Sequence, residues 1–190
     1  MKKVSILMIS LSLLGIISCK DAKKSTESTD QKQVEAEAPK PKVATVNLMA
    51  KSDSKTTGSV VFTEENGTVS MIAKLSGLEP GEHAIHIHES SDCSAPDGSS
   101  AGGHWNPTKQ PHGKWGADAG YHKGDIGNLT ADENGNASIE MKTDEWCIGC
   151  DDDTKNIVGK SIIVHVAKDD FTTQPTGNAG GRISCGGIIE

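Results

Sequence analysis

Apolar and polar residues alternate with a period of two along several short stretches of the chain, beginning near residue 43. Successive side chains of a β-strand point to opposite faces, so this period predicts strands that bury one face. Turn signals such as Asn66-Gly67 and Asn134-Gly135 lie between these stretches. No window of ten residues shows convincing helical periodicity. We expect strands at 43–49, 58–63, 69–75, 84–88, 136–141 and 161–166.

Two long segments, about 89–125 and 167–182, interrupt this alternation. Loops of such length are uncommon in compact domains and usually serve a function. The pattern therefore predicts an all-β sandwich or barrel with two long functional loops. A content of 21 glycines against only six aromatic residues also suits a turn-rich β protein better than a helix bundle.

The residues before the first strand have the features of an export signal. Lys2 and Lys3 precede a nearly unbroken apolar run over 4–17, which is typical of a secretory signal peptide and too short for a spanning helix. The run ends at Ser18-Cys19, which resembles a bacterial lipobox, in which the cysteine is lipidated and becomes the new N-terminus. The alternative is an ordinary signal peptide followed by an incidental cysteine.

These features divide the chain into three parts. We expect a signal peptide over 1–18, a lipidated Cys19 with a flexible tether over 19–42, and a folded domain over 43–190. The tether is rich in Lys, Glu, Ser, Thr, Ala and Pro, and it has too little apolar surface to offset the entropy cost of ordering. Such a protein would be exported and attached to a lipid bilayer of the cell envelope, on its periplasmic or surface side.

The net charge of −7 bears on possible partners. Nucleic-acid binding requires a basic face, and the chain has no dense stripe of Lys and Arg beyond its first residues. Removal of 1–18 takes away two of the 19 basic side chains and changes the net charge to −9. The sequence thus argues against nucleic acid, and the charge would repel a small anion at long range.

Six of the seven histidines lie in motifs that suit metal ions. His86 and His88 are separated by one residue on a predicted strand, so both imidazoles point to the same face and can bind one ion. His122 and Asp125 are three residues apart in a glycine-rich segment, where both can contact one cation. His83 has no such setting and is expected to be a hydrogen-bonded strand residue. The other members are His104, His112 and His165.

Together these motifs resemble those of the copper/zinc superoxide dismutases, over nearly all of residues 43–190. The matching segments are HIHE at 86–89, GGHWNP at 102–107, HKGDIGN at 122–128, VH at 164–165 with DD at 169–170, and TGNAGGRISCGG at 176–187. The family fold is a Greek-key β-barrel. The resemblance implies that superoxide is disproportionated to O2 and hydrogen peroxide by alternate reduction and reoxidation of a histidine-bound copper that is bridged to zinc.

The resemblance also implies one copper and one zinc per chain. The copper ligands would be His86, His88, His104 and His165. The zinc ligands would be His104, His112, His122 and Asp125, with His104 bridging the two ions. Nitrogen donors suit copper, while three imidazoles and a carboxylate form a closed tetrahedral shell for zinc. Copper is therefore the reactive ion.

Three residues receive further roles from the resemblance. Asp169 would hydrogen-bond one copper histidine and one zinc histidine, which fixes both rings. Arg182 would hold superoxide beside copper. His104 would take up a proton when copper is reduced and return it to the peroxide product. The alternatives are a turn cap for Asp169 and a surface ion pair for Arg182.

Without Cys19, four cysteines remain, an even number that favours two disulfides in an exported protein and allows three pairings. The resemblance pairs Cys93 with Cys185, which would tie the long metal loop to the last strand. Cys147 and Cys150 depart from the family pattern. We favour a local disulfide over a thioredoxin-like redox pair or a third metal site, because no βαβ pattern surrounds them.

The segment 169–181 contains no lysine, whereas long-loop eukaryotic members use loop lysines to attract superoxide. We therefore expect a weak dependence of the rate on salt, unless Lys109, Lys114 or Lys123 does the steering. One additional residue lies between His112 and His122 and should be absorbed by the glycine-rich loop.

Two other functions compete with dismutation. A copper-binding or copper-delivery module on the same scaffold would be expected to lack a ligand, the bridge or the arginine, and none is missing. A purely structural, zinc-stabilised lipoprotein would leave His86, His88 and His165 unexplained. Both a monomer and a homodimer are compatible with the strand pattern.

Overall fold

The computed structural model describes residues 40–189. The predicted signal peptide, Cys19 and the tether up to residue 39 lie outside the described residues. Within the described range, no helix has the length and apolar character needed to cross a membrane. The one helical element in this range is a single 3₁₀ turn, η1 (Ser99–Ala101).

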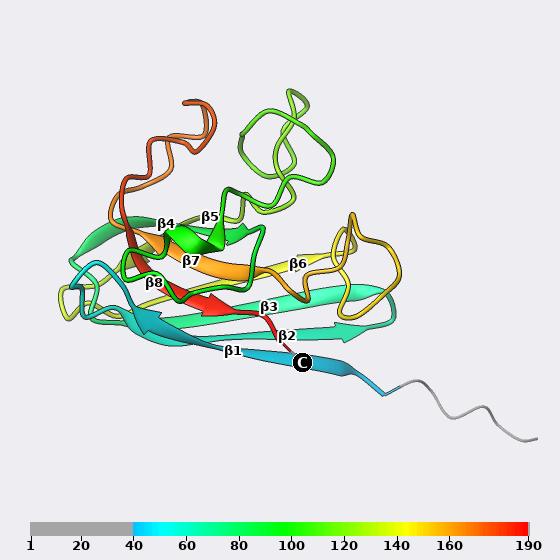
Figure 1. Cartoon of the computed structure of the whole chain (residues 1–190), viewed down its shortest axis with the longest axis horizontal. Coiled ribbons are helices and arrows are strands. Elements are labelled where there is room, and N and C mark those ends of the chain that lie inside the picture. The colour runs from blue at the N-terminus through cyan, green and yellow to red at the C-terminus, as the bar shows by residue number, and fades with distance from the viewer. Residues whose placement is uncertain (1–39, 190) are drawn as a thin grey trace, which may run out of the picture. The chain divides into compact units, whose positions relative to one another are not determined.

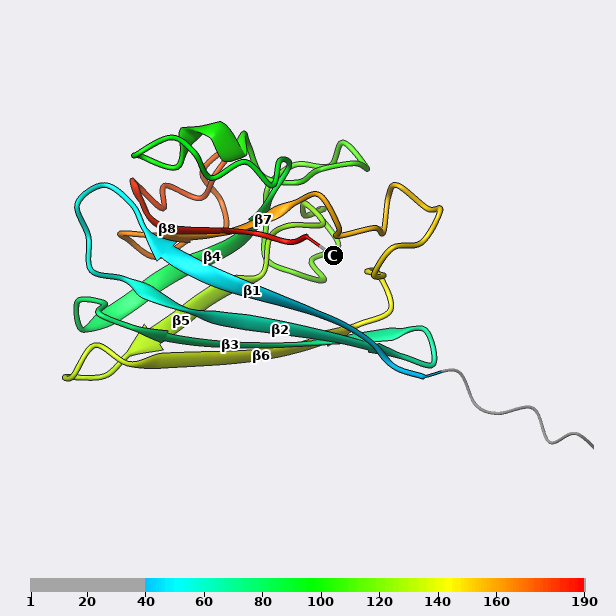
Figure 2. The same ribbon diagram turned by 60° about the horizontal axis from the view of Figure 1, so that its bottom comes forward.

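In residues 40–189, eight strands form one antiparallel sheet that curls into a nearly closed barrel (Figure 1). They are β1 (Lys42–Ala50), β2 (Thr57–Glu65), β3 (Thr68–Ser76), β4 (Gly81–His88), β5 (Gly127–Ala131), β6 (Ala137–Thr143), β7 (Ser161–His165) and β8 (Arg182–Gly187). Their order is β5-β4-β7-β8-β1-β2-β3-β6. Because β4 lies beside β7 and β3 beside β6, the connections cross the barrel in the Greek-key manner. The end strands β5 and β6 also contact each other (Figure 2).

All six predicted strands are present, with bounds that shift by three residues or fewer. The pattern missed β5 and β8. In β5 only Leu129 and Ala131 supply buried apolar side chains besides glycine, and in β8 the most buried positions are Ser184, Cys185 and a glycine. Neither strand has the run of large apolar residues that makes a strand visible in a sequence.

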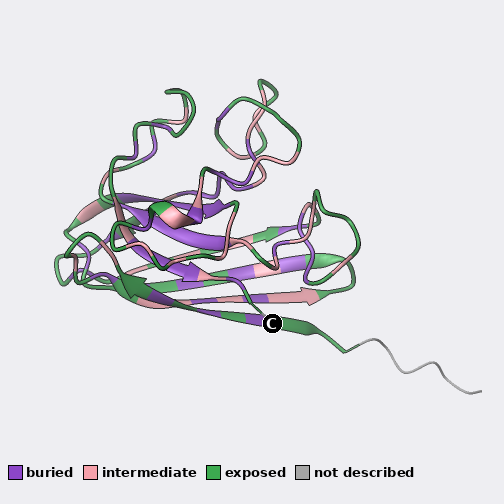
Figure 3. Ribbon diagram, in the orientation of Figure 1, coloured by how far each residue is buried: buried purple, intermediate pink, exposed green. Residues whose placement is uncertain are grey.

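Strands β1 to β3 have one buried and one more exposed face, which explains their clear alternation. In β1, Ala44, Val46 and Leu48 are buried between exposed neighbours. In contrast, β7 is buried throughout and β4 is buried from its third residue onward (Figure 3). Ile85 and Ile87 of β4 belong to the barrel core. The alternate residues of β4 therefore point outward but are covered by the loops.

Both predicted long loops are present. The segments 89–126 and 166–181 connect β4 to β5 and β7 to β8, and both rise on the same side of the barrel (Figure 1). A third irregular segment, 144–160, connects β6 to β7 and was not singled out by the pattern. It contains the Cys147–Cys150 disulfide, which confirms the local pairing.

The second disulfide joins Cys93 to Cys185, with 5.8 Å between the Cα atoms. This pairing, expected from the resemblance, ties the first long loop to β8. Cys185 also packs with Ala101 and Ile163 in a small apolar cluster separate from the barrel core. The first loop is thus attached to the outer surface of the barrel by both covalent and apolar contacts.

Candidate metal centre

Two neighbouring strands supply three of the predicted ligands. His86 and His88 lie on β4, with the side-chain alternation that directs Ile85 and Ile87 into the core. His165 ends β7, which pairs with β4. A register shift between β7 and β8 occurs at this residue, and such irregularities commonly redirect a side chain.

His104 is held against β4 by backbone pairing. An isolated antiparallel bridge joins His104 to His88. On either side, Trp105 N–H donates to the Ile87 carbonyl at 2.8 Å, and Glu89 N–H donates to the Gly103 carbonyl at 3.0 Å. The buried Trp105 ring packs in the barrel core. His104 is therefore placed beside the strand histidines by contacts that do not involve its own ring.

His122 and Asp125 are the two ends of one tight turn. Asp125 N–H donates to the His122 carbonyl at 3.0 Å, and His122 N–H donates to Asp125 Oδ2 at 2.8 Å. Gly124 lies so close to Ile87 that a Cβ at residue 124 would collide with the Ile87 carbonyl oxygen. The three-residue spacing thus works because glycine lets the turn pack directly on β4.

The predicted ligands form two groups. In each group the four possible ligand atoms lie within 4.8 Å of one another, and every member is buried. The first group is His86, His88, His104 and His165. The second group is His104, His112, His122 and Asp125. His104 belongs to both groups. Among the described residues there is no third group that would make Cys147 and Cys150 part of a metal site.

Unpartnered nitrogen atoms show that the two groups fit metal ions. All six histidines of these groups have one buried ring nitrogen without a hydrogen-bond partner. A buried polar atom in this state costs about 1–3 kcal/mol, so six of them in one place need an explanation. A metal ion would supply it, because each nitrogen offers a lone pair. The atoms are His86 Nδ1, His88 Nε2, His104 Nε2, His112 Nδ1, His122 Nδ1 and His165 Nε2.

In His88 and His165, the other ring nitrogen donates a hydrogen bond to a backbone carbonyl. His88 Nδ1 donates to the Gly102 carbonyl at 2.9 Å, and His165 Nδ1 donates to the Gly180 carbonyl at 3.1 Å. With the proton on Nδ1, the lone pair is on Nε2. These carbonyls therefore set the tautomer that metal binding requires.

One buried carboxylate connects the two groups. His86 Nε2 donates to Asp169 Oδ2 at 2.8 Å, and His112 Nε2 donates to Asp169 Oδ1 at 2.9 Å. The Asp169 backbone N–H in turn donates to Asn128 Oδ1 at 2.7 Å. Asp169 Oδ1 also accepts from the Phe171 N–H at 2.7 Å, so the carboxylate caps a turn as well. The two interpretations of Asp169 are therefore not exclusive.

Burial keeps His88, His104 and His165 neutral. It lowers the pKa of His88 well below its usual value, and the neighbouring histidines act in the same direction. Burial likewise lowers the pKa of His104 to about 4 and that of His165 to about 3. Neutral imidazole is the form that binds a metal. These three members of the first group are thus ready to bind a cation at neutral pH.

The second group contains a carboxylate and behaves differently. Burial alone would raise the pKa of Asp125, but close contacts with the rings of His104, His112 and His122 outweigh it and lower that pKa strongly. Burial lowers the pKa of His112, but Asp125 and Asp169 outweigh it and raise that pKa to about 9. The charge of the Asp125 carboxylate thus compensates for a bound cation.

Arg182 is half-buried and is held by two backbone carbonyls. Its Nη1 donates to Gly98 O and its Nη2 to Gly102 O, both at 2.7 Å. Within residues 40–189 it makes no ion pair, so the surface ion-pair alternative is wrong. The Gly102 carbonyl also accepts from His88. The arginine is therefore anchored to the same peptide group as one of the predicted copper ligands.

Other predicted residues have simpler surroundings. His83 hydrogen-bonds through both ring nitrogens, to the His165 carbonyl at 2.9 Å and the Glu79 carbonyl at 2.8 Å, which confirms its expected structural role. Lys123 forms an ion pair with Glu145. Lys109 and Lys114 are exposed and unpaired in the described part of the chain.

The groups that orient the predicted ligands could not be identified from residue types. The carbonyls of Gly98, Gly102 and Gly180 act through the backbone, which is chemically the same in every residue. Asn128 and Asp169 are the exceptions, since both lie in segments that match the family. Glu145 and Trp146, which contact the turn at 122–125, carried no signal of their own.

Comparisons with known proteins agree with this geometry. A family model described as "Copper/zinc superoxide dismutase (SODC)" matches residues 56–188. A curated relative from Caulobacter vibrioides, "Superoxide dismutase [Cu-Zn]", is 39% identical over 140 residues, which cover 72% of this chain and 80% of the relative. The crystal structure of a double mutant of a SOD-like protein from Bacillus subtilis aligns with a TM-score of 0.69 and 32% identity, over 77% of this chain and 97% of that one.

Proposed function

The chain belongs to the copper/zinc superoxide dismutase family, and from this premise we infer that it converts two superoxide radicals and two protons into O2 and hydrogen peroxide. The observation that carries this function is the pair of buried ligand groups that share His104. One group offers nitrogen donors alone and the other adds a carboxylate, which are the donor sets suited to copper and zinc.

We assign copper to His86, His88, His104 and His165, and zinc to His104, His112, His122 and Asp125. Copper, when bound, supplies the one-electron chemistry by accepting an electron from one superoxide and passing it to another. These four residues would leave zinc no open position for substrate, so zinc would serve to hold the site together. The unpartnered nitrogens of the six histidines support this assignment.

Arg182 binds the substrate in this proposal. Superoxide is a small anion, and the guanidinium is a permanent cation with several N–H donors. Two of these donors already bind Gly98 O and Gly102 O, which fixes the plane of the group. Binding through a preoriented cation offsets the unfavourable net charge of the protein, because the interaction acts at short range.

His104 handles a proton in this proposal. Its Nδ1 lies 2.9 Å from Asp125 Oδ1, whereas its Nε2 is buried and has no hydrogen-bond partner. A proton held at Nε2 would therefore face the first ligand group and could be transferred to the peroxide product. Asp169 supports this geometry, since it orients His86 and His112, whose ring centroids lie 4.0 and 5.3 Å from that of the shared histidine.

The two disulfides indicate that the folded domain is exported to an oxidising compartment. We further propose that residues 1–18 are removed, that Cys19 carries a lipid, and that residues 19–42 tether the domain of residues 43–190 to the membrane surface. Mass spectrometry of the mature protein should find a lipid-modified N-terminal cysteine. Cleavage elsewhere, or an unmodified Cys19, would contradict the anchor but not the enzymatic function.

Pulse radiolysis of the protein loaded with copper and zinc tests the activity most directly. We expect decay of superoxide that is first order in enzyme and is sustained over many turnovers. The rival function is copper delivery on the same scaffold. It would be favoured by stoichiometric copper binding without turnover, a result that would overturn the proposed function.

A further inference from the structure

The segment 144–150, at the start of the third irregular loop, contacts the turn that carries His122 and Asp125. We propose that Glu145 and Trp146 are positioning residues of the zinc site and that the Cys147–Cys150 disulfide keeps this pair in place. The inference rests on the proposed assignment of zinc to this turn. It gives a role to the two cysteines that the family motifs leave unexplained.

Three contacts join this segment to the turn. The Tyr121 hydroxyl donates to Glu145 Oε1 at 2.6 Å, and Lys123 Nζ forms an ion pair with Glu145 Oε2. Trp146 Nε1 donates to the Lys123 carbonyl at 2.9 Å. Glu145 and Trp146 thus bind both chain neighbours of His122. Their contacts restrict the backbone from which its imidazole extends.

The opposite side of the turn is fixed by the barrel. Gly124 N–H donates to the Trp105 carbonyl at 3.0 Å, and its carbonyl accepts from Ile87 N–H at 2.9 Å. These bonds hold the second half of the turn, close to Asp125. The first half is held by Asp125 Oδ2, which accepts from the His122 N–H, and by the contacts of Glu145 and Trp146 with the two neighbours of His122. Loss of the Glu145 and Trp146 contacts would therefore loosen the His122 end while leaving the Asp125 end in place.

The positioning pair is itself well supported. Trp146 is 1% exposed and makes edge contacts with the rings of Phe62 and Trp115, at centroid distances of 6.1 and 5.3 Å. Cys147, the next residue, pairs through its backbone with the end of the loop, where its N–H donates to the Lys155 carbonyl at 2.8 Å. The indole is therefore part of a rigid body that includes the core.

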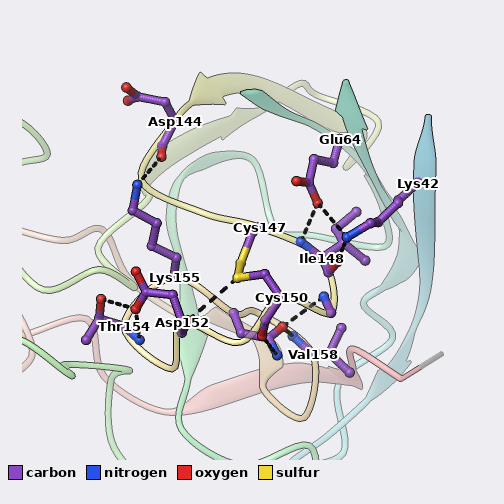
Figure 4. The surroundings of a disulfide bond; sticks show 12 residues. Lys42, Glu64, Asp144, Cys147, Ile148, Cys150, Asp152, Thr154, Lys155 and Val158 are labelled. Carbon is purple, nitrogen blue, oxygen red and sulfur yellow. Dashed lines mark hydrogen bonds and ion pairs between the residues drawn. A yellow bond between two sulfur atoms is a disulfide. The ribbon is translucent and has the colours of Figure 1, made fainter. Parts of the chain in front are cut away.

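After Cys147 the chain hydrogen-bonds to Lys42 at the start of β1 and to Glu64 near the end of β2, which form the barrel rim here (Figure 4). Ile148 N–H donates to Glu64 Oε2 at 2.7 Å, and Lys42 Nζ donates to the Ile148 carbonyl at 2.8 Å. The disulfide to Cys150 closes this tight loop. Without the covalent link, hydrogen bonds alone would hold the chain at 147–150, and the backbone that carries Trp146 would be less firmly placed.

The test measures zinc affinity rather than enzyme activity. In the full domain, Glu145→Gln and Trp146→Phe are compared with the unmodified protein by chelator competition for zinc. We expect about tenfold weaker binding in each, the lower end of the range for groups that orient metal ligands. Copper affinity should stay within about twofold, because the copper histidines are carried by β4, β7 and the His104 bridge.

Cobalt(II) at the zinc position provides a spectroscopic readout that loss of stability alone would not change. Its visible bands report ligand geometry, so we expect shifted or weakened bands in Glu145→Gln, in Trp146→Phe and in a Cys147→Ser/Cys150→Ser double variant. Tyr121→Phe removes one donor to Glu145 without touching the core. It serves as a further variant if Trp146→Phe does not fold.

Asp152→Asn is the matched control. Asp152 lies in the same loop, but it is exposed and its carboxylate bonds only to Thr154. The substitution should leave zinc affinity and the cobalt spectrum unchanged. The proposal is overturned if Glu145→Gln and Trp146→Phe bind zinc as tightly as the unmodified protein, or if Asp152→Asn weakens zinc binding equally.

His122→Ala separates this inference from the zinc assignment on which it rests. We expect it to weaken zinc binding far more than either positioning variant. If His122→Ala left zinc affinity unchanged, the ligand assignment itself would be wrong. If it abolished zinc binding while the positioning variants bound normally, the assignment would hold and only the positioning role would be lost.

Discussion

The two ligand groups are built on different kinds of structure. Three of the four members of the proposed copper group extend from β4 or β7, whose backbones are fixed by paired neighbours on both sides. All four members of the zinc group lie in the single irregular segment 89–126. A strand holds its ligands through its own hydrogen-bond ladder, whereas a loop needs additional residues to hold each ligand in place.

The supporting contacts follow this difference. On the copper side, backbone carbonyls suffice to orient His88 and His165. On the zinc side, support comes from side chains distant in sequence, namely Asp169 behind His112 and the Glu145–Trp146 pair beside His122. Each side also has its own disulfide, Cys93–Cys185 near Arg182 and Cys147–Cys150 next to Trp146. Substitutions of Glu145 and Trp146 should therefore weaken the zinc side selectively, whereas a substitution of Asp169, which also contacts His86, should affect both sides.

The largest effect is expected from His104→Ala, because this residue belongs to both groups. The affinity of the variant for both metals should fall by more than the roughly 100-fold that is typical when a residue hydrogen-bonded to a metal ligand is replaced. In the unmodified protein, removal of zinc should change the copper spectrum, and in the variant this coupling should disappear. His112→Ala is the control, since it should affect zinc alone. A copper spectrum of His104→Ala that still responds to zinc would contradict the bridge.

Asp169→Asn should affect both ligand groups, because the Asp169 carboxylate accepts one hydrogen bond from a histidine of each group. The amide can accept only one of the two histidine hydrogen bonds with its oxygen, so we expect metal affinity to fall by about 10- to 100-fold. Chelator competition for each metal measures the effect. Asp170→Asn is the matched control, because Asp170 is exposed and bonds only to its own turn. Equal losses in the two variants would show that the turn, rather than the histidine contacts, matters.

Arg182→Ala should separate substrate binding from metal binding. Loss of a charge-assisted contact of about 1.5–3 kcal/mol would lower the rate at low superoxide concentration by roughly 10- to 100-fold. Both metals should remain bound, because Arg182 contacts carbonyls and no ligand side chain. Elemental analysis of copper and zinc, done alongside the activity assay, shows whether metal content or substrate binding has changed. A parallel fall in copper content would mean that the arginine supports the site instead of binding the anion.

The two disulfides should contribute unequally to stability. Cys93–Cys185 closes a loop with a sequence separation of 92 residues, and Cys147–Cys150 one of 3 residues. In the chain-entropy model their removal lowers the free energy of unfolding by about 4–5 and about 2 kcal/mol. Urea denaturation of the two paired Cys→Ser variants checks this order. We expect removal of Cys147–Cys150 to reduce stability less than removal of Cys93–Cys185 does, but to weaken zinc binding more.

The smallest effect concerns salt. The segment 169–181 has no lysine, and Lys123 is compensated by Glu145, so attraction of superoxide depends on short-range contacts. The rate should therefore change only slightly between low and moderate ionic strength. Stopped-flow assays over that range measure it. A steep fall would indicate steering by the two exposed lysines, Lys109 and Lys114, and their replacement by methionine should then abolish the salt dependence.

Much of the site was predictable because its signals are local. The pleat of a strand makes the spacing of His86 and His88 meaningful, and the tight turn does the same for His122 and Asp125. Family resemblance then supplied the grouping of ligands that lie far apart in the chain. In contrast, β5 and β8 were missed because their buried positions include glycine, serine and cysteine, which carry little apolar signal.

The alternating strands, the two long loops and the residue types available for metal binding follow from the order of residues along the chain, since each depends on neighbours within a few positions. The backbone carbonyls that orient His88, His165 and Arg182, and the distant side chains that support the zinc turn, are set by the folded arrangement. Peptide groups are alike in every residue, and a contact between Trp146 and Lys123 leaves no trace in the local pattern. Such contacts exist only once the barrel brings the segments together.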